Sequence, residues 1–194
     1  HLKLQFKILN FLKKKNFPYK IPFPLKTKNS REIIVLSKKR IWVYEMINGS
    51  NRVRPNLNQI KQMAKALATY HKYIKNLKGK IKTDNPNLRI QNSFKKMKKI
   101  NGKTEADLLA IKHRDFFEEI FNKVKNINLD TNKLFLHGDF DSSNVLFHNG
   151  ELNAIIDFDE TSYSSRVFDV AVSLRDSCYT KGKIDIGKIK IYLK

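Results

Sequence analysis

The stretch LFLHGDFDSSNVLFHNG, residues 134–150, gathers four polar side chains between two apolar runs: His137, Asp139, Asp141 and Asn144. A carboxylate such as that of Asp139 can orient a hydroxyl group and accept its proton. An amide oxygen such as that of Asn144 can bind a metal ion. A polar turn at the end of a strand is the alternative interpretation, and the residues that follow allow a choice between the two.

The next segment, NVLFHNGELNAIID (residues 144–157), predicts a β-hairpin, because the Asn-Gly pair at its centre suits the tight turn that joins two strands. With a regular two-residue turn, Asn144 faces Ile155. Because side chains alternate along a strand, Asp157 then points to the same face as Asn144, with Cα atoms roughly 7–8 Å apart. An amide oxygen and a carboxylate so placed can share a Mg²⁺ ion, which prefers oxygen ligands.

A base at one end of this hairpin and two metal ligands on its inner face are what phosphoryl transfer asks of a protein. The reaction needs a carboxylate to orient the attacking hydroxyl, a metal to bridge the phosphates, and rigid positioning. Each of the three residues alone has a structural explanation, as a turn cap or a strand end. Their common register favours the catalytic interpretation.

A second motif, KHRDFF at residues 112–117, contains the His-Arg-Asp triplet that opens the catalytic loop of protein kinases. That loop requires an asparagine five residues after the aspartate. Asp115 is followed at that distance by Ile120, whereas Asp139 is followed by Asn144. The 112–117 segment also lies within a helical pattern, so we interpret it as a helix surface.

The composition restricts the class of protein. Of 194 residues, 41% are hydrophobic, which is typical of a globular protein. No apolar run is long enough for a membrane span, and the single cysteine, Cys178, excludes an internal disulfide. The net charge of +21 attracts anions. Because the lysines are scattered along the chain, we interpret the charge as compositional, and a nucleic-acid partner as unlikely.

Apolar residues recur at helical spacing in four segments, which predict helices over residues 2–15, 57–77, 104–126 and 166–179. Thr104 suits the N-cap of the third. The remaining segments predict an extended stretch at 17–27, a β-hairpin from the runs 31–37 and 40–47, a linker at 47–56 and irregular structure at 78–103.

Three stretches carry a resemblance to a known family: HGDFDSSNVLF (137–147), IIDFDE (155–160) and RVFDVAVSL (166–174). They resemble the signature of the aminoglycoside phosphotransferase, choline kinase and homoserine kinase type II family, whose usual form is HGDxHPxNxL, then IDFD or IDFE, then PxxDLA. The resemblance implies an α+β, protein-kinase-like bilobal fold. Residues 1–46 would form a partial N-lobe, and residues 47–194 a mostly helical C-lobe with a small catalytic β-hairpin.

The resemblance also assigns roles to residues that match the signature. Asp139 would be the catalytic base, and Asn144 and Asp157 would bind Mg²⁺. His137 would brace the loop by hydrogen bonding. Asp169 would hold the loop from the following helix, which is a structural task.

The same resemblance places ATP in the cleft between the lobes. Its adenine would meet a hinge segment, although an ordinary strand end explains these residues nearly as well: Glu45, Met46 and Ile47. Asp159 would lie beside the metal site with a less defined role. The family's His-Pro-Gly is replaced by Asp141, Ser142 and Ser143, which adds a third carboxylate to the loop.

Two further differences concern the ends of the chain. In the family, a nucleotide-covering loop and a phosphate-gripping lysine would precede residue 1, and Gln5 aligns with the glutamate that pairs with that lysine. Helices that build the acceptor pocket would follow residue 194. We therefore expect a fragment or truncated relative of a cytoplasmic, ATP- and Mg²⁺-dependent kinase of a small hydroxyl compound. A non-catalytic pseudokinase is the alternative.

Overall fold

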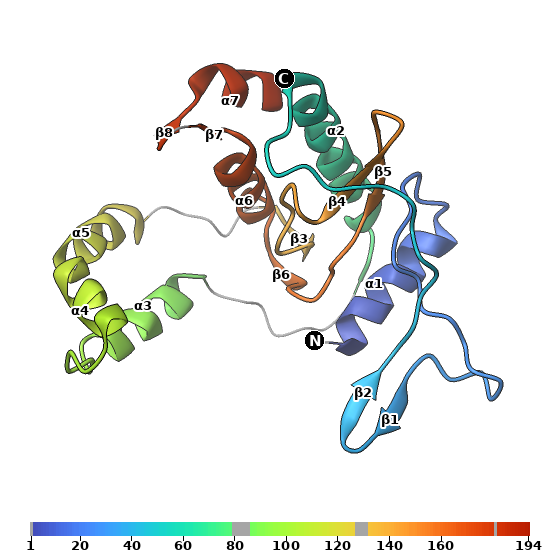
Figure 1. Ribbon diagram of the computed structural model, residues 1–194, viewed down its shortest axis with the longest axis horizontal. Coiled ribbons are helices and arrows are strands. Elements are labelled where there is room, and N and C mark those ends of the chain that lie inside the picture. Colours follow the sequence, from blue (N-terminus) through green and yellow to red (C-terminus); the bar gives the residue numbers. More distant parts are fainter. Residues whose placement is uncertain (1, 79–85, 127–131, 181) are drawn as a thin grey trace. The chain divides into compact units, whose positions relative to one another are not determined.

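A computed structural model describes residues 2–78, 86–126, 132–180 and 182–194 (Figure 1). The chain divides into two compact units, His1–Ile81 with Asn132–Lys194, and Lys82–Thr131. The larger unit therefore joins the two ends of the sequence. The expected lobe boundary at residue 46 is a different division and stays a prediction.

Helices α1 (Leu2–Lys14) and α2 (Leu57–Ile74) form the core of the larger unit, as their apolar spacing predicts. Asn56 and Gln59 cap α2 reciprocally, each side chain accepting a hydrogen bond from the other's backbone N–H at 2.9 Å. Each helix buries one apolar face completely or nearly so: Phe6, Ile8, Leu9 and Leu12 of α1, and Ile60, Met63, Ala66, Leu67, Tyr70 and Ile74 of α2.

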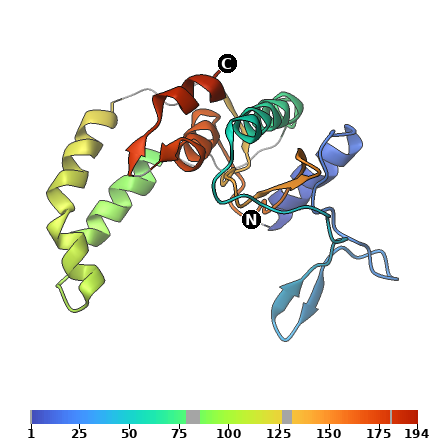
Figure 2. The ribbon, with the colours of Figure 1, turned by 45° about the horizontal axis from the view of Figure 1, so that its top comes forward.

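Helix α2 packs against several other elements of the larger unit. It contacts α1, the strands β3 (Lys133–Leu136) and β5 (Glu151–Ile155), and the helices α6 (Val167–Ser177) and α7 (Ile186–Tyr192). The hairpin of β4 (Val145–His148) and β5 lies beside α2 in both views (Figures 1 and 2). Gln62 of α2 fixes the end of this hairpin, because its amide donates to the Gly150 carbonyl and accepts from the Leu152 N–H.

The strands of the described residues form four antiparallel pairs. The expected N-terminal hairpin consists of β1 (Ile34–Leu36) and β2 (Lys39–Ile41), joined by Ser37 and Lys38, both of which have positive φ. Strand β3 pairs with β6 (Ser162–Ser165), and β7 (Tyr179–Thr180) pairs with β8 (Lys183–Ile184). Strands β6, β7 and β8 and helix α7 (Ile186–Tyr192) are not among the elements predicted from the sequence.

The predicted register of the β4–β5 hairpin is wrong by one residue beyond its middle. His148 and Phe147 pair as expected with Glu151 and Leu152, but Val145 pairs with Ile155. Asn153 is the extra residue of a β-bulge, so Asn144 faces Ile156 and not Ile155. The bulge is held from outside the hairpin, because the Asn153 carbonyl accepts a hydrogen bond from the Lys20 N–H and its side chain donates to the Asn48 carbonyl.

The smaller unit corrects two expectations. Residues 86–97 form helix α3 (Pro86–Met97) and are not irregular, whereas 79–85 lie outside the described residues. The single helix expected over 104–126 is two helices, α4 (Glu105–Lys112) and α5 (Arg114–Val124). The helix is interrupted at His113, whose φ of −102° and ψ of 5° are not helical. Phe94 of α3 packs on Phe121 of α5, with ring centroids 5.4 Å apart.

This combination of helices and small antiparallel sheets confirms the expected α+β class. Thr104 caps α4 as predicted, with its hydroxyl accepting the Asp107 N–H at 3.1 Å. Cys178 is buried. In the described part of the chain, no helix combines the length and apolar character that crossing a membrane requires.

Candidate active site

The loop between β3 and β4 turns sharply at its second residue, Gly138. Its φ is +92°, in the region that glycine adopts without strain. A Cβ atom at this position would lie 2.0 Å from the Glu160 carbonyl oxygen. The backbone of the loop therefore approaches the segment after β5 more closely than any side chain would allow.

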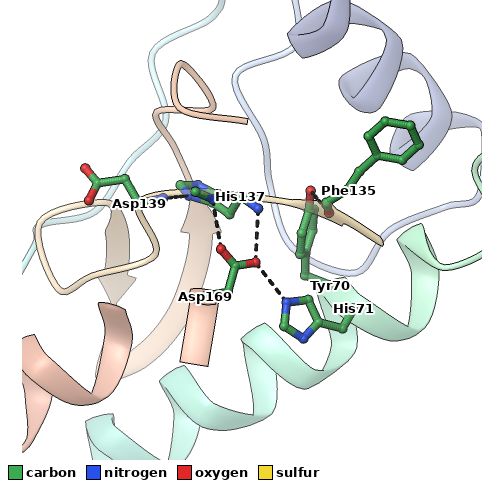
Figure 3. Close-up of polar contacts among 7 residues, drawn as sticks. Tyr70, His71, Phe135, His137, Asp139 and Asp169 are labelled. Carbon is green, nitrogen blue, oxygen red and sulfur yellow. Dashed lines mark hydrogen bonds and ion pairs between the residues drawn. The ribbon is translucent and has the colours of Figure 1, made fainter. Parts of the chain in front are cut away.

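Asp169 holds the start of this loop from the first turn of α6 (Figure 3). One carboxylate oxygen accepts the Gly138 N–H at 2.8 Å, and the other accepts the His137 N–H at 3.1 Å. The second oxygen also lies 2.8 Å from Nε2 of His71 on α2. Asp169 is fully buried, so these three partners replace the water that its charge would otherwise require.

The ring of His137 is fixed in one tautomer by two hydrogen bonds. Nδ1 accepts the Asp139 N–H at 3.3 Å, and Nε2 lies 2.9 Å from the Ile156 carbonyl, to which it must donate. A protonated Nδ1 could not accept the Asp139 N–H, so the first contact requires the neutral imidazole. Burial lowers the pKa of His137, against the opposing charge of Asp169, and so favours the same state. The ring thus links the loop to the end of β5.

Asp139 lies half-buried in the middle of the loop, where the structure can give its carboxylate the properties of a base. The Asn144 side-chain amide donates to its Oδ2 at 3.0 Å and to its backbone carbonyl at 2.8 Å. Burial, reinforced by the charge of Asp141, raises the pKa of Asp139. A carboxylate with a raised pKa accepts a proton more readily, as general base catalysis requires.

Asp141, the carboxylate that the sequence left unexplained, shapes the second half of the loop. Its Oδ1 accepts the Ser143 N–H at 2.8 Å and the Ser143 hydroxyl at 2.5 Å. Its backbone carbonyl accepts the Asn144 N–H at 3.2 Å, which closes a four-residue turn. Asp141 therefore acts within the loop itself, both by hydrogen bonding and through its effect on Asp139.

Asn144 and Asp157, the two predicted metal ligands, lie at the open end of the β4–β5 hairpin. Although the predicted register is wrong, the charge of Asp157 reaches the loop, since it contributes to the pKa of Asp139. Asp157 has a φ of +58°, which is uncommon for a residue other than glycine and recurs at functional sites. The bulge and this conformation together set its position, in place of the regular alternation that we assumed.

The donor set of these two residues fits a hard divalent cation. The Nδ2 group of Asn144 makes both of its hydrogen bonds, which leaves Oδ1 as a ligand atom, and the carboxylate of Asp157 is exposed. In the described parts of the chain, no group of three or more His, Cys, Asp or Glu side chains could hold a metal. Mg²⁺ often binds through one or two protein groups together with water and phosphate oxygens, which matches this small set.

The remaining predicted residues are those after β5 and those of the expected hinge segment. Asp159 and Glu160 line a cavity of about 340 Å³ together with four residues of α1 and the N-terminal hairpin segment: Leu2, Gln5, Arg40 and Trp42. Glu45 and Met46 are exposed, Met46 by 88%, and Ile47 is half-buried. The hinge segment is thus accessible, and its contact with adenine stays a prediction.

Four further residues of the site were not predicted from the sequence. His71 contacts Asp169, Tyr70 donates to the Phe135 carbonyl at 3.0 Å, Gln62 holds the hairpin turn, and Asp176 of α6 accepts the Ser142 N–H at 2.8 Å. Each of these contacts joins segments at least 34 positions apart in the sequence. No local pattern points to such pairs.

Comparison with known proteins identifies the class to which this arrangement belongs. The model of the phosphotransferase enzyme family matches residues 2–186, so the chain belongs to that family. No curated protein matches the chain. The fold is that of the protein-kinase-like phosphotransferases, as expected from the loop and hairpin signature.

Three solved structures illustrate the similarity. The amicoumacin kinase hAmiN, in complex with AMP-PNP, Ca²⁺ and Ami, has a TM-score of 0.67 and 14% identity, over 97% of this chain and 60% of that one. The gentamicin complex of APH(2")-IIa has a TM-score of 0.65 and 19% identity, over 97% of this chain and 64% of that one. The aminoglycoside phosphotransferase of Alicyclobacillus acidocaldarius has a TM-score of 0.61 and 18% identity, over 89% of this chain and 57% of that one. The chain thus spans less than two thirds of each of these proteins.

Proposed function

We propose that this chain carries the catalytic centre of an ATP-dependent phosphotransferase. The enzyme would move the γ-phosphoryl group to a hydroxyl of a small molecule of the homoserine, choline or aminoglycoside type. The observation that supports this most strongly is the environment of Asp139. Its carboxylate is held by Asn144, its pKa is raised by burial, and its loop is fixed by the buried Asp169.

The chain's own residues would act on the acceptor hydroxyl. Asp139 would accept a hydrogen bond from the hydroxyl, align its oxygen with the γ-phosphorus and take its proton as the new O–P bond forms and ADP leaves. Because Asn144 donates to one oxygen of Asp139, the other oxygen is the one directed to the acceptor. Asp141 would keep the pKa of Asp139 high enough for this transfer.

Asn144 Oδ1 and the Asp157 carboxylate would hold Mg²⁺, and Asp159 lies two residues further on. When bound, Mg²⁺·ATP supplies the phosphoryl group and the charge neutralisation that its transfer requires. The adenine would contact the exposed hinge at Glu45, Met46 and Ile47. The similar amicoumacin kinase structure contains AMP-PNP and Ca²⁺, which supports a nucleotide and a divalent cation as ligands of this fold. The cytoplasmic location stays a prediction.

The test is transfer of labelled γ-phosphate from ATP to a panel of homoserine, choline and aminoglycosides. We expect transfer to at least one acceptor, lowered by about 10²–10⁴-fold in Asp139→Asn, because general base catalysis contributes that much. Asp115→Asn is the matched control, since Asp115 is an exposed aspartate of the rejected His-Arg-Asp motif. Mg²⁺·ATP binding without transfer to any acceptor would favour the pseudokinase alternative.

A further inference from the structure

Helix α6 directs two carboxylates at the catalytic loop, those of Asp169 and Asp176. The proposed function gives no role to Asp176. Asp176 lies seven residues after Asp169, which places both on one side of the helix, two turns apart. Its Oδ2 accepts the Ser142 N–H at 2.8 Å. Asp169 thus holds the first residues of the loop, and Asp176 holds a residue near its end.

The Ser142 N–H needs this acceptor because of where Ser142 stands in the turn. Residues 141–144 form a turn closed by the hydrogen bond from the Asn144 N–H to the Asp141 carbonyl. Ser142 is its second residue, whose N–H has no partner within a turn of this kind. Ser142 is only 3% exposed, so water is a poor substitute for the carboxylate.

The turn at residues 141–144 also sets the position of the groups that we assign to catalysis. Asn144, its last residue, donates to the Asp139 carboxylate and carries the oxygen assigned to the metal. A displacement of the turn would move Asn144 away from Asp139 and change both contacts at once. The Asp176 carboxylate is therefore linked to Asp139 through two hydrogen bonds and the backbone of a single turn.

We propose that Asp176 is a positioning residue for phosphoryl transfer, which fixes the end of the catalytic loop as Asp169 fixes its start. This inference rests on the proposed function. Asp176→Ala would leave the buried Ser142 N–H without a partner, free the turn and lower kcat by roughly tenfold. KM for ATP should rise as well, because the displaced Asn144 also carries the oxygen assigned to the metal. Asp176→Asn keeps an acceptor oxygen, so its kcat should lie between those of the wild type and Asp176→Ala.

A second substitution makes the proposal specific. Proline is favoured at the second position of such a turn, fixes φ near the required value and has no N–H group. Ser142→Pro should therefore restore kcat in the Asp176→Ala background to within about threefold of the wild type. A general loss of stability would not be corrected in this way, so the rescue separates positioning from a purely structural role.

The experiment measures kcat and KM for the wild type, Asp176→Ala, Asp176→Asn and Asp176→Ala/Ser142→Pro. Arg175→Ala, at an exposed neighbouring position on α6, serves as control. In parallel, the NMR signals of the Asn144 side-chain amide report the turn without any need for catalysis. We expect Asp176→Ala to shift these signals and speed hydrogen exchange of the Ser142 amide, with both effects smaller in Asp176→Asn.

Unchanged kcat in Asp176→Ala, or a loss of kcat that Ser142→Pro does not reverse, would overturn the proposal. If the wild type transfers no phosphate, the proposed function fails separately, and the NMR signals decide whether Asp176 positions the turn. Signals of Asn144 that stay in place in Asp176→Ala would then refute the positioning role. If Asp176→Ala does not fold, the same criteria apply to Asp176→Asn.

Discussion

Replacement of Asp169 should be among the most destabilising single substitutions in the larger unit. Its buried carboxylate accepts hydrogen bonds from the backbone of His137 and Gly138 and contacts the His71 ring. Asp169→Ala removes the acceptor for all three groups at once. Because the side chain is fully buried, no solvent replaces it.

The magnitude follows from the number and kind of hydrogen bonds. Each hydrogen bond to a charged group contributes about 1.5–3 kcal/mol, but three bonds to one carboxylate are not additive. Removal of one partner from a buried charged cluster costs about 3–5 kcal/mol, which is our expectation for Asp169→Ala. Asp169→Asn keeps one acceptor oxygen but turns an NH₂ group toward a backbone N–H, so we expect a loss of about 2 kcal/mol.

Urea unfolding followed by circular dichroism measures both losses as differences in the free energy of unfolding. Asp115→Ala, at an exposed position of α5, should change it by less than about 0.5 kcal/mol and serves as control. A loss below about 1 kcal/mol in Asp169→Ala would refute the reasoning. It would mean that the loop backbone finds other partners and that Asp169 does not hold it.

Three further predictions concern the loop itself. Asp141→Asn removes a charge that raises the pKa of Asp139, so the acidic limb of the kcat/KM profile should move to lower pH; an unmoved limb would argue against Asp139 as the base. Gly138→Ala should lower the free energy of unfolding by more than about 2 kcal/mol, as measured in urea, because its Cβ would collide with the Glu160 carbonyl at a φ of +92°. Burial lowers the pKa of His137 in the folded protein below its ordinary value of 6.5, so the unfolded chain binds more protons. The free energy of unfolding should therefore fall as the pH drops below 6.5, and His137→Gln should reduce this pH dependence. An unchanged dependence would contradict the buried neutral ring.

Local signals in the sequence were sufficient for the helices of the core and for the position of the loop. The apolar spacing of α1 and α2 and the Thr104 cap correspond to the observed helices. Helix α3 also has local signals, since Pro86 suits a first helical turn and Lys95 and Lys96 suit a last one.

Other features depend on contacts that no local pattern contains. The bulge at Asn153 is held by Lys20 and Asn48, the latter 105 positions away, so a register derived from the turn alone was wrong. The interruption between helices α4 and α5 at His113 contains no proline or glycine that would predict it. Asp176 is visible as a partner of the loop only once α6 is placed against Ser142.

The most direct test of the account is calorimetric titration of the chain with AMP-PNP, with and without Mg²⁺, in the wild type and in Asp157→Asn. The account predicts binding that depends on Mg²⁺ in the wild type and at least tenfold weaker binding in Asp157→Asn, because that carboxylate is one of two protein ligands assigned to the metal. Equal affinity in the two proteins, or affinity that does not respond to Mg²⁺, would contradict the assignment of the β4–β5 hairpin end as the metal and nucleotide site.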